Sequence, residues 1–196
     1  MKTLLTIYGS PTPPGKLARA LDAAEEHATG HPGWRAVRLS PLTPTVWPED
    51  AAEQVAAASG VLVASPVFRA SFPATLKLLF DQLPVAAFGT RPVAILTVAA
   101  APEHALAAER HLRDVLAWFG ALTAPHPLFL ADRLLSGAPL DADVRADLGA
   151  LVDQVVSLTA LPEGTRLGPT PLAARRGPRT GRPPHPHTDS RKEPTT

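Results

Sequence analysis

Short apolar runs alternate along this chain with longer segments in which apolar residues recur every three or four positions. The run GVLVA at residues 60–64 is too short for a helix, and glycine and proline bound it. Such a run is typical of a strand that is covered on both faces of a sheet. After Pro73, by contrast, leucines and a phenylalanine recur at helical spacing as far as Leu83. This spacing predicts a helix with one buried face.

The same pattern predicts five strands and five helices in alternation along the chain. Strands are expected at residues 3–8, 34–39, 60–64 and 91–98 and within 122–130, where Pro125 and Pro127 break the start and 128–130 is the most regular part. Helices are expected at residues 16–30, 51–58 and 73–83, from a first turn at Pro102 to the terminator Gly120, and at 141–160.

This alternation predicts the fold class, an α/β three-layer sandwich with a five-stranded parallel sheet and helices on both faces. Right-handed crossovers favour a doubly wound arrangement. With the strand order 2-1-3-4-5, strands one and three are neighbours at the topological switch point. The loops that follow these two strands then face one ligand.

The apolar pattern stops at the end of the fifth helix. We therefore expect one domain at residues 1–160 and a disordered tail at 161–196, which is rich in proline, arginine and histidine. His185 and His187 in this tail make a poor metal site, and no metal centre is predicted. The tail carries seven basic and three acidic residues, or +4, which leaves −3 for the rest of a chain of net charge +1.

Composition excludes several function classes. The chain has no cysteine, which excludes disulfides, thiolate zinc sites and cysteine nucleophiles. The body of the chain offers no basic stripe interleaved with aromatic residues, so specific nucleic-acid binding is not expected. No apolar run is long enough to span a membrane, and the first strand does not resemble a signal peptide. A cytoplasmic protein is the expectation.

The loop at residues 9–16 is a candidate phosphate site. It joins the first strand to the first helix, where free backbone NH groups and the positive end of the helix dipole point the same way. Ser10 and Thr12 add hydroxyl donors, and Lys16 adds a positive charge. An ordinary strand-to-helix turn explains the same residues, and this alternative stays open.

A second stretch points to one protein family more specifically than the loop at residues 9–16 does. Residues 65–81 read SPVFRASFPATLKLLFD, and with GSP at 9–11 they resemble the NADPH-dependent FMN reductase family of flavodoxin-like proteins. Phe68 stands where the family usually has tyrosine, and Ala74 where it has glycine. Within the family, the two-component reductases that supply reduced flavin to alkanesulfonate monooxygenases are the most similar. The likeness covers most of residues 1–160 and none of the tail.

The resemblance implies a site made of three loops. The first would hold the FMN phosphate, the second would border the flavin ring, and the third would meet the polar edge of the flavin. The corresponding residues are Ser10, Thr12, Gly15 and Lys16; Pro66, Val67, Phe68 and Arg69; and Ala99, Ala100 and Ala101. The family's third loop is normally rich in glycine, and alanine takes positive φ only at a cost. We therefore expect weaker flavin binding or a differently shaped loop.

The implied reaction is hydride transfer from NADPH or NADH to flavin N5, which needs stacking and alignment rather than a catalytic side chain. No catalytic residue is predicted. His104 is either a cofactor contact or a residue at the surface start of a helix. A homotetramer and a flavin-dependent monooxygenase partner are further implications of the resemblance. Two alternatives stay open, an FMN-bound quinone, azo-compound or metal reductase of the same fold and a non-catalytic flavodoxin-like module.

Overall fold

A parallel sheet with the strand order β2-β1-β3-β4-β5 forms the centre of the computed structural model, which describes residues 1–161, 165 and 168. This order and the α/β class agree with the prediction. The elements are β1 (Lys2–Tyr8), α1 (Lys16–Gly30), β2 (Trp34–Leu39), α2 (Ala51–Ala57), β3 (Gly60–Pro66), α3 (Ala74–Gln82), β4 (Pro92–Ala99), the 3₁₀ helix η1 (Pro102–His104), α4 (Ala107–Phe119), β5 (Leu122–Thr123), β6 (Leu128–Ala131), the 3₁₀ helix η2 (Asp132–Leu135) and α5 (Ala142–Leu158).

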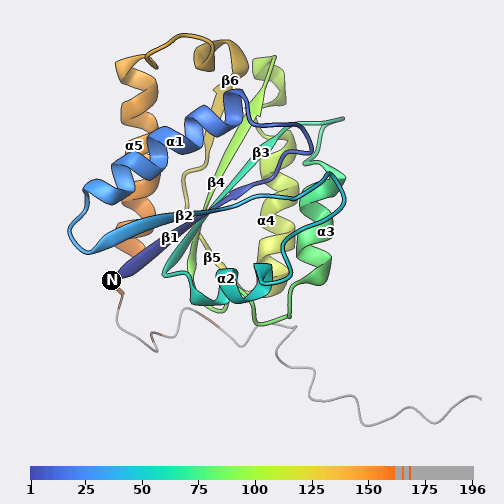
Figure 1. Ribbon diagram of the computed structural model, residues 1–196, viewed down its shortest axis with the longest axis vertical. Helices are drawn as coiled ribbons and strands as arrows, with labels where there is room; N and C mark the ends of the chain where they lie inside the picture. Colours follow the sequence, from blue (N-terminus) through green and yellow to red (C-terminus); the bar gives the residue numbers. More distant parts are fainter. Residues whose placement is uncertain (162–164, 166–167, 169–196) are drawn as a thin grey trace, which may run out of the picture.

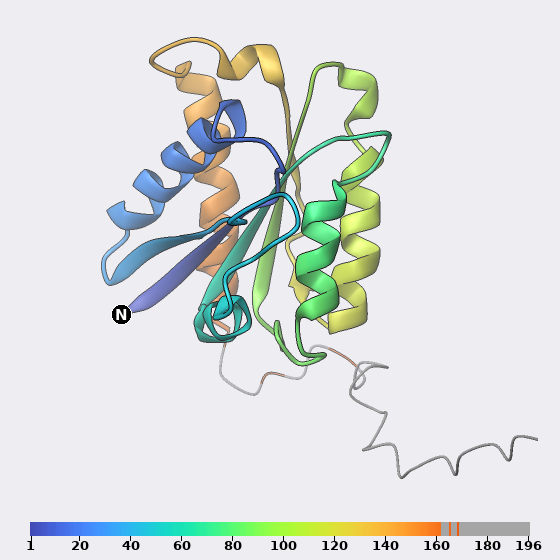
Figure 2. The same cartoon turned by 45° about the vertical axis from the view of Figure 1, so that its right-hand side comes forward.

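Helices cover both faces of the sheet. In Figures 1 and 2, α1 and α5 lie on one side, while α3 and α4 lie side by side on the other. Each side has its own core, because side chains of a central strand alternate between the two faces: Leu62 packs with α1 and α5, and Val61 and Val63 pack with α3 and α4. The sheet is thus buried on both faces, as its continuously apolar strands predicted.

The fifth strand is present but divided. Both β5 and β6 pair in parallel with β4, and the segment that contains Pro125 and Pro127 separates them. Proline cannot donate to a ladder, so pairing is interrupted between the two segments. The sheet therefore has a sixth strand segment that the sequence pattern did not predict.

The helix predicted from Pro102 is also interrupted. Pro102–His104 form a single 3₁₀ turn, and α4 begins only at Ala107. The prediction of a continuous helix was wrong because this first turn has no buried face; the side chain of Leu106 is 69% exposed. Pro73 lies one position before α3, as its N-cap, rather than inside its first turn.

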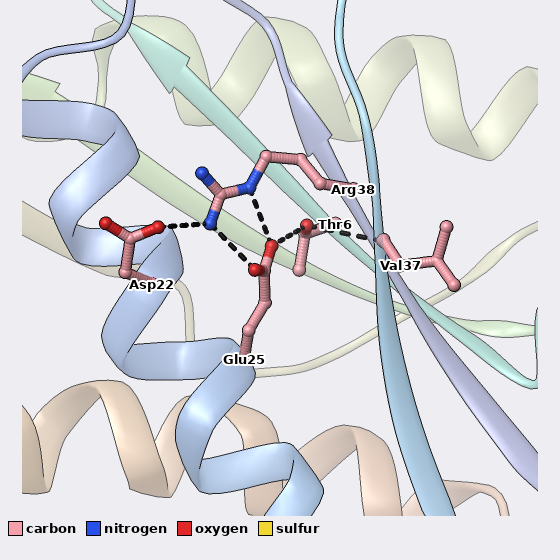
Figure 3. Close-up of polar contacts among 5 residues, drawn as sticks. All are labelled: Thr6, Asp22, Glu25, Val37 and Arg38. Carbon is pink, nitrogen blue, oxygen red and sulfur yellow. Dashed lines mark hydrogen bonds and ion pairs between the residues drawn. The ribbon is translucent and has the colours of Figure 1, made fainter.

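A cluster of charged side chains joins α1 to β1 and β2 (Figure 3). The guanidinium of Arg38 donates from Nε and Nη2 to the two carboxylate oxygens of Glu25, at 2.7 Å each, and from Nη2 to Asp22 at 2.7 Å. The buried hydroxyl of Thr6 donates to the same Glu25 carboxylate. Burial lowers the pKa of Arg38, but its bonds and attraction to Glu25 and Asp22 outweigh this and raise the pKa.

The predicted tail, with His185 and His187, lies outside the described residues apart from Leu161, Thr165 and Gly168. Within the part of the chain that the structure describes, we find no helix that is both long and apolar enough to cross a membrane.

Candidate functional site

A cleft of about 400 Å³ opens at the carboxyl ends of β1, β3 and β4. These strand ends point to the top of the molecule in Figure 1. The cleft brings together all the predicted site residues except Arg69 and Ala101. Its lining consists of Tyr8, Ser10, Thr12, Pro13, Gly15, Lys16, Leu17, Pro66, Val67, Phe68, Val98, Ala99, Ala100 and Asp132.

The first loop is held in place by its own polar groups. Ser10 is buried, and its Oγ lies 2.9 Å from the Thr12 hydroxyl and accepts a hydrogen bond from the Thr12 NH at 3.3 Å. The Tyr8 hydroxyl lies 3.2 Å from the Thr12 carbonyl oxygen and 3.1 Å from that of Pro13. These hydrogen bonds within the loop fix its shape.

Gly9 lets the first loop pass close to β3. Its NH donates to the carbonyl oxygen of Ala64 at 2.8 Å. A Cβ at this position would lie 2.7 Å from that oxygen and 2.8 Å from a methyl group of Leu76. Only glycine fits this approach without movement of the backbone, so Gly9 keeps the first and second loops adjacent.

The amino end of α1 supplies donors to the cleft. Gly15 is the N-cap and makes no side-chain cap bond, and the first helical bond runs from the Arg19 NH to the Gly15 carbonyl at 3.1 Å. The NH groups of the first helical turn, which starts at Lys16, thus have no partner inside the helix. Uncapped NH groups at a helix amino end are a favourable environment for an anion such as a phosphate.

An acidic residue that the sequence analysis did not assign to the site faces this anion position. The Lys16 ammonium lies 3.1 Å from a carboxylate oxygen of Asp132, which follows β6 directly and lines the cleft. The place of Asp132 at the carboxyl end of an edge strand was the signal that could have assigned it to the site.

The second loop ends in a tight hairpin turn. Phe68 and Ser71 exchange backbone bonds of 2.7 and 3.0 Å, and the two residues between them, Arg69 and Ala70, have φ of 51° and 62°. Two positive φ values at the centre of a turn are typical of type I′, which favours Asn-Gly. Here the ring of Phe68 is 44% exposed and lines the cleft, whereas Arg69 does not.

Helix α4 braces this hairpin. A ring nitrogen of His111, Nδ1, lies 2.9 Å from the Ser71 hydroxyl. The sequence analysis did not propose a role for either residue. His104 is exposed on η1, and neither it nor Arg110 is among the residues that line the cleft.

The third loop forms a short apolar wall. Ala99 is buried at the end of β4, Ala100 is exposed, and both line the cleft. Ala101 has φ −121°, and among the described residues only Arg69 and Ala70 combine a side chain with positive φ. These alanines therefore keep ordinary backbone conformations.

The residues of the cleft fit FMN. Hydroxyls, uncapped NH groups and Lys16 lie together at the first loop, where they suit a phosphate. Pro66, Val67, Phe68 and Ala99 offer apolar surface that suits a flavin ring. Among the residues that line the cleft, Asp132 alone is acidic, and its negative charge would repel a phosphate.

A family comparison decides what kind of protein this is. Residues 2–134 match the model of the family described as NADPH-dependent FMN reductase. The chain belongs to this family. The match includes β1, β3 and β4 and the loops that build the cleft.

Individual relatives are similar at moderate identity. The chain is 33% identical over 99 residues to an FMN reductase (NADPH) from Pseudomonas aeruginosa, which covers 47% of this chain and 53% of the relative. It is 33% identical over 90 residues to the NADH-dependent FMN reductase SfnF from Pseudomonas fluorescens, and this match covers 43% of this chain and 48% of the relative. The chain thus matches about half the length of these relatives.

A solved structure shares the fold over more of the chain. The apo form of the NADH:FMN oxidoreductase EMOB superposes with a TM-score of 0.73 and 22% identity, and covers 90% of this chain and 97% of that one. The structure of the flavodoxin, WrbA-like protein from Agrobacterium tumefaciens superposes with a TM-score of 0.61 and 16% identity, over 81% of this chain and 98% of that one. These similarities, together with the strand order, identify the fold as flavodoxin-like.

Proposed function

We propose that this protein is an NAD(P)H-dependent FMN reductase. The observation that supports it best is the single cleft in which the first loop, the second loop and the end of β4 meet with donors at one side and apolar surface at the other. Bound FMN would accept a hydride from NADPH or NADH at N5, which is chemistry that the cofactor itself supplies. The protein contributes binding and alignment.

Each loop has a separate task in this proposal. Ser10, Thr12, Gly15 and Lys16 bind the phosphate, and Pro66, Val67, Phe68 and Arg69 border the ring. Ala99 and Ala100 limit the cleft on the side of β4, and Ala101 follows them outside its lining. Because Phe68 is aromatic and half exposed, it offers a stacking surface without needing to move from a buried position.

Steady-state kinetics test the proposal. Purified protein mixed with FMN and NADPH, and separately with NADH, should bleach flavin absorbance faster than a protein-free control. Phe68→Ala should lower kcat/KM by about tenfold because stacking area is lost. Leu106→Ala, which removes an exposed apolar side chain outside the cleft, should leave kcat/KM unchanged. No acceleration with either nicotinamide would refute the proposed activity.

We further propose that FMN is an exchangeable substrate and that a flavin-dependent monooxygenase takes the reduced product. Asp132 beside the phosphate position and the lack of hydroxyls in the third loop both favour weak retention. Protein purified without added flavin should then be colourless. A yellow protein that reduces a quinone or azo compound without free flavin would support the alternative of an FMN-bound reductase.

A homotetramer built on α3 and α4 is also proposed. A surface depression of about 580 Å³ at these helices is lined by Val85 and Trp118, which are 44% and 46% exposed, and by Val115, which is partly exposed. Large exposed aromatic and aliphatic groups at one place favour burial by another subunit. Sedimentation velocity of the protein and of Trp118→Glu tests this assembly; a monomer at micromolar concentration would contradict it. A cytoplasmic location, which suits a cysteine-free nicotinamide enzyme, is testable by cell fractionation.

A further inference from the structure

Helices α1 and α5 cross on one side of the sheet (Figure 2). A second cluster of polar side chains joins these helices away from the cleft. His27 and His31, four positions apart, lie near the carboxyl end of α1 and face Asp153 of α5. The two Nε2 atoms lie 2.8 and 2.9 Å from the same carboxylate oxygen of Asp153. One potential ligand atom from each of the three residues lies within 4.8 Å of the other two.

From this geometry we propose that His27, His31 and Asp153 form a binding site for a divalent transition-metal ion, with zinc as the simplest case. Imidazole nitrogen and carboxylate oxygen are ligands that zinc, nickel and copper accept. Ligands in a tetrahedral zinc site lie roughly 3.3 Å apart, given metal–ligand distances of about 2.0–2.2 Å. The two Nε2–Oδ1 distances of 2.8 and 2.9 Å are shorter than this spacing, so the carboxylate would move slightly away from the two rings to admit an ion.

The helix surface below the cluster is shaped for the His27 ring. A Cβ at Gly149 of α5 would lie 2.8 Å from Cε1 and 2.9 Å from Nδ1 of His27. Glycine at this position therefore lets the imidazole lie against α5, one turn from Asp153. Glycine within a helix lowers helix stability relative to alanine, so Gly149 makes room for the His27 ring but destabilises α5.

The surroundings leave room for further ligands. The three side chains are 41%, 30% and 51% exposed, so water has access to the remaining coordination positions. The nearby Arg145 guanidinium is paired with Glu26 at 3.3 Å, and its charge is compensated.

When the metal binds, each neutral imidazole carries its proton on Nδ1 and presents the Nε2 lone pair. The Nε2 protons that face Asp153 would move to Nδ1 by exchange with solvent, and bonds from the three ligands to one ion would replace the two contacts with Asp153. The ion ties α1 to α5, two elements more than 100 positions apart in the sequence.

Titration calorimetry of the untagged full chain with zinc chloride alone tests the site. We expect one zinc per chain, and at a hundredfold excess over Kd the unfolding temperature should rise by about 5–10 °C. His31→Gln and Asp153→Asn keep hydrogen-bonding capacity but should weaken zinc binding at least tenfold. His126→Ala, which removes a histidine outside the cluster, should bind as the unmodified protein does.

Two further variants make the outcome decisive. The His185→Ala/His187→Ala double variant removes histidines outside the described residues and should retain the zinc stoichiometry. Gly149→Ala should keep or raise the unfolding temperature without metal, because alanine favours the helix, yet weaken zinc binding at least tenfold by displacing the His27 ring. Zinc binding that is absent, or that survives both His31→Gln and Asp153→Asn, would overturn the proposal.

Discussion

Arg69 and Ala70 hold a backbone conformation that residues with a Cβ adopt only at a cost. Their positive φ values, 51° and 62°, lie at the tip of the second loop, between the two bonds that pair Phe68 with Ser71. The left-handed conformation costs an L-residue roughly 1–2 kcal/mol. This strain persists because the ladder to β4 and the contact with His111 fix both ends of the turn.

Ala70→Gly should therefore stabilise the protein. We expect the free energy of unfolding in urea to rise by about 0.5–1 kcal/mol, since the relief of strain exceeds the entropy that glycine adds to the unfolded chain. Ala100→Gly is the matched control, because Ala100 has no positive φ, and it should leave stability unchanged or lower it. Equal effects of the two variants would show that the turn is not strained.

The pairing of Lys16 with Asp132 predicts a change in flavin affinity. Asp132→Asn removes a negative charge from the anion position and frees Lys16, so FMN should bind about threefold to fivefold more tightly, which corresponds to about 1 kcal/mol for a partly exposed pair. Fluorescence titration measures this. Riboflavin, which has no phosphate, should bind both forms equally, and Asp143→Asn on α5 should change neither affinity. Tighter riboflavin binding by Asp132→Asn would contradict an electrostatic effect on the phosphate.

At the scale of elements, the cluster of Figure 3 fixes α1 against the edge of the sheet. The side chains of Arg38 and Glu25 are only 24% and 22% exposed. Removing one partner of such a pair leaves the other partly buried without its counter-charge, which costs more than an exposed ion pair contributes.

Glu25→Ala should accordingly lower the free energy of unfolding by about 2–3 kcal/mol, because Arg38 loses two of its three hydrogen bonds to carboxylates and keeps only the one to Asp22, and the Thr6 hydroxyl loses its bond to Glu25. Asp81→Ala provides a comparison, since it breaks the exposed pair with Lys77 and should change stability by less than about 0.5 kcal/mol. Chemical denaturation of the two variants side by side measures the difference. Similar losses would mean that the Glu25 pair behaves as an ordinary surface pair.

At the scale of the whole molecule, the described residues that build the two hydrophobic cores all lie between Leu4 and Leu158. A chain that ends after Leu161 should therefore unfold within about 2 °C of the full chain and reduce FMN at the same rate. Differential scanning calorimetry and the flavin assay check this. A large loss of either property would show that residues 162–196 contribute to the fold or to the activity.

Local patterns in the sequence determined most of the architecture. The apolar runs and helical spacings identified the strands and the main helices. Burial of one or both faces of an element requires apolar residues at fixed intervals, and these intervals can be read from residues close together in the sequence. The alternation of elements and the handedness of crossovers favoured a doubly wound sandwich, and the order 2-1-3-4-5 assumed for it is the order that the structure shows. Failures occurred at the first turn of the fourth helix and at the fifth strand, where exposure and proline outweighed the local pattern.

The tertiary structure alone decided which distant side chains meet. Lys16 contacts Asp132 across 116 positions, and His27 contacts Asp153 across 126, and neither pair leaves a periodic trace in the sequence. Such contacts depend on how helices cross the sheet and each other, which is set by packing of the two cores. The sequence by itself thus determined the fold and the loops of the cleft, while packing alone placed a carboxylate at the anion position and brought two histidines to one aspartate.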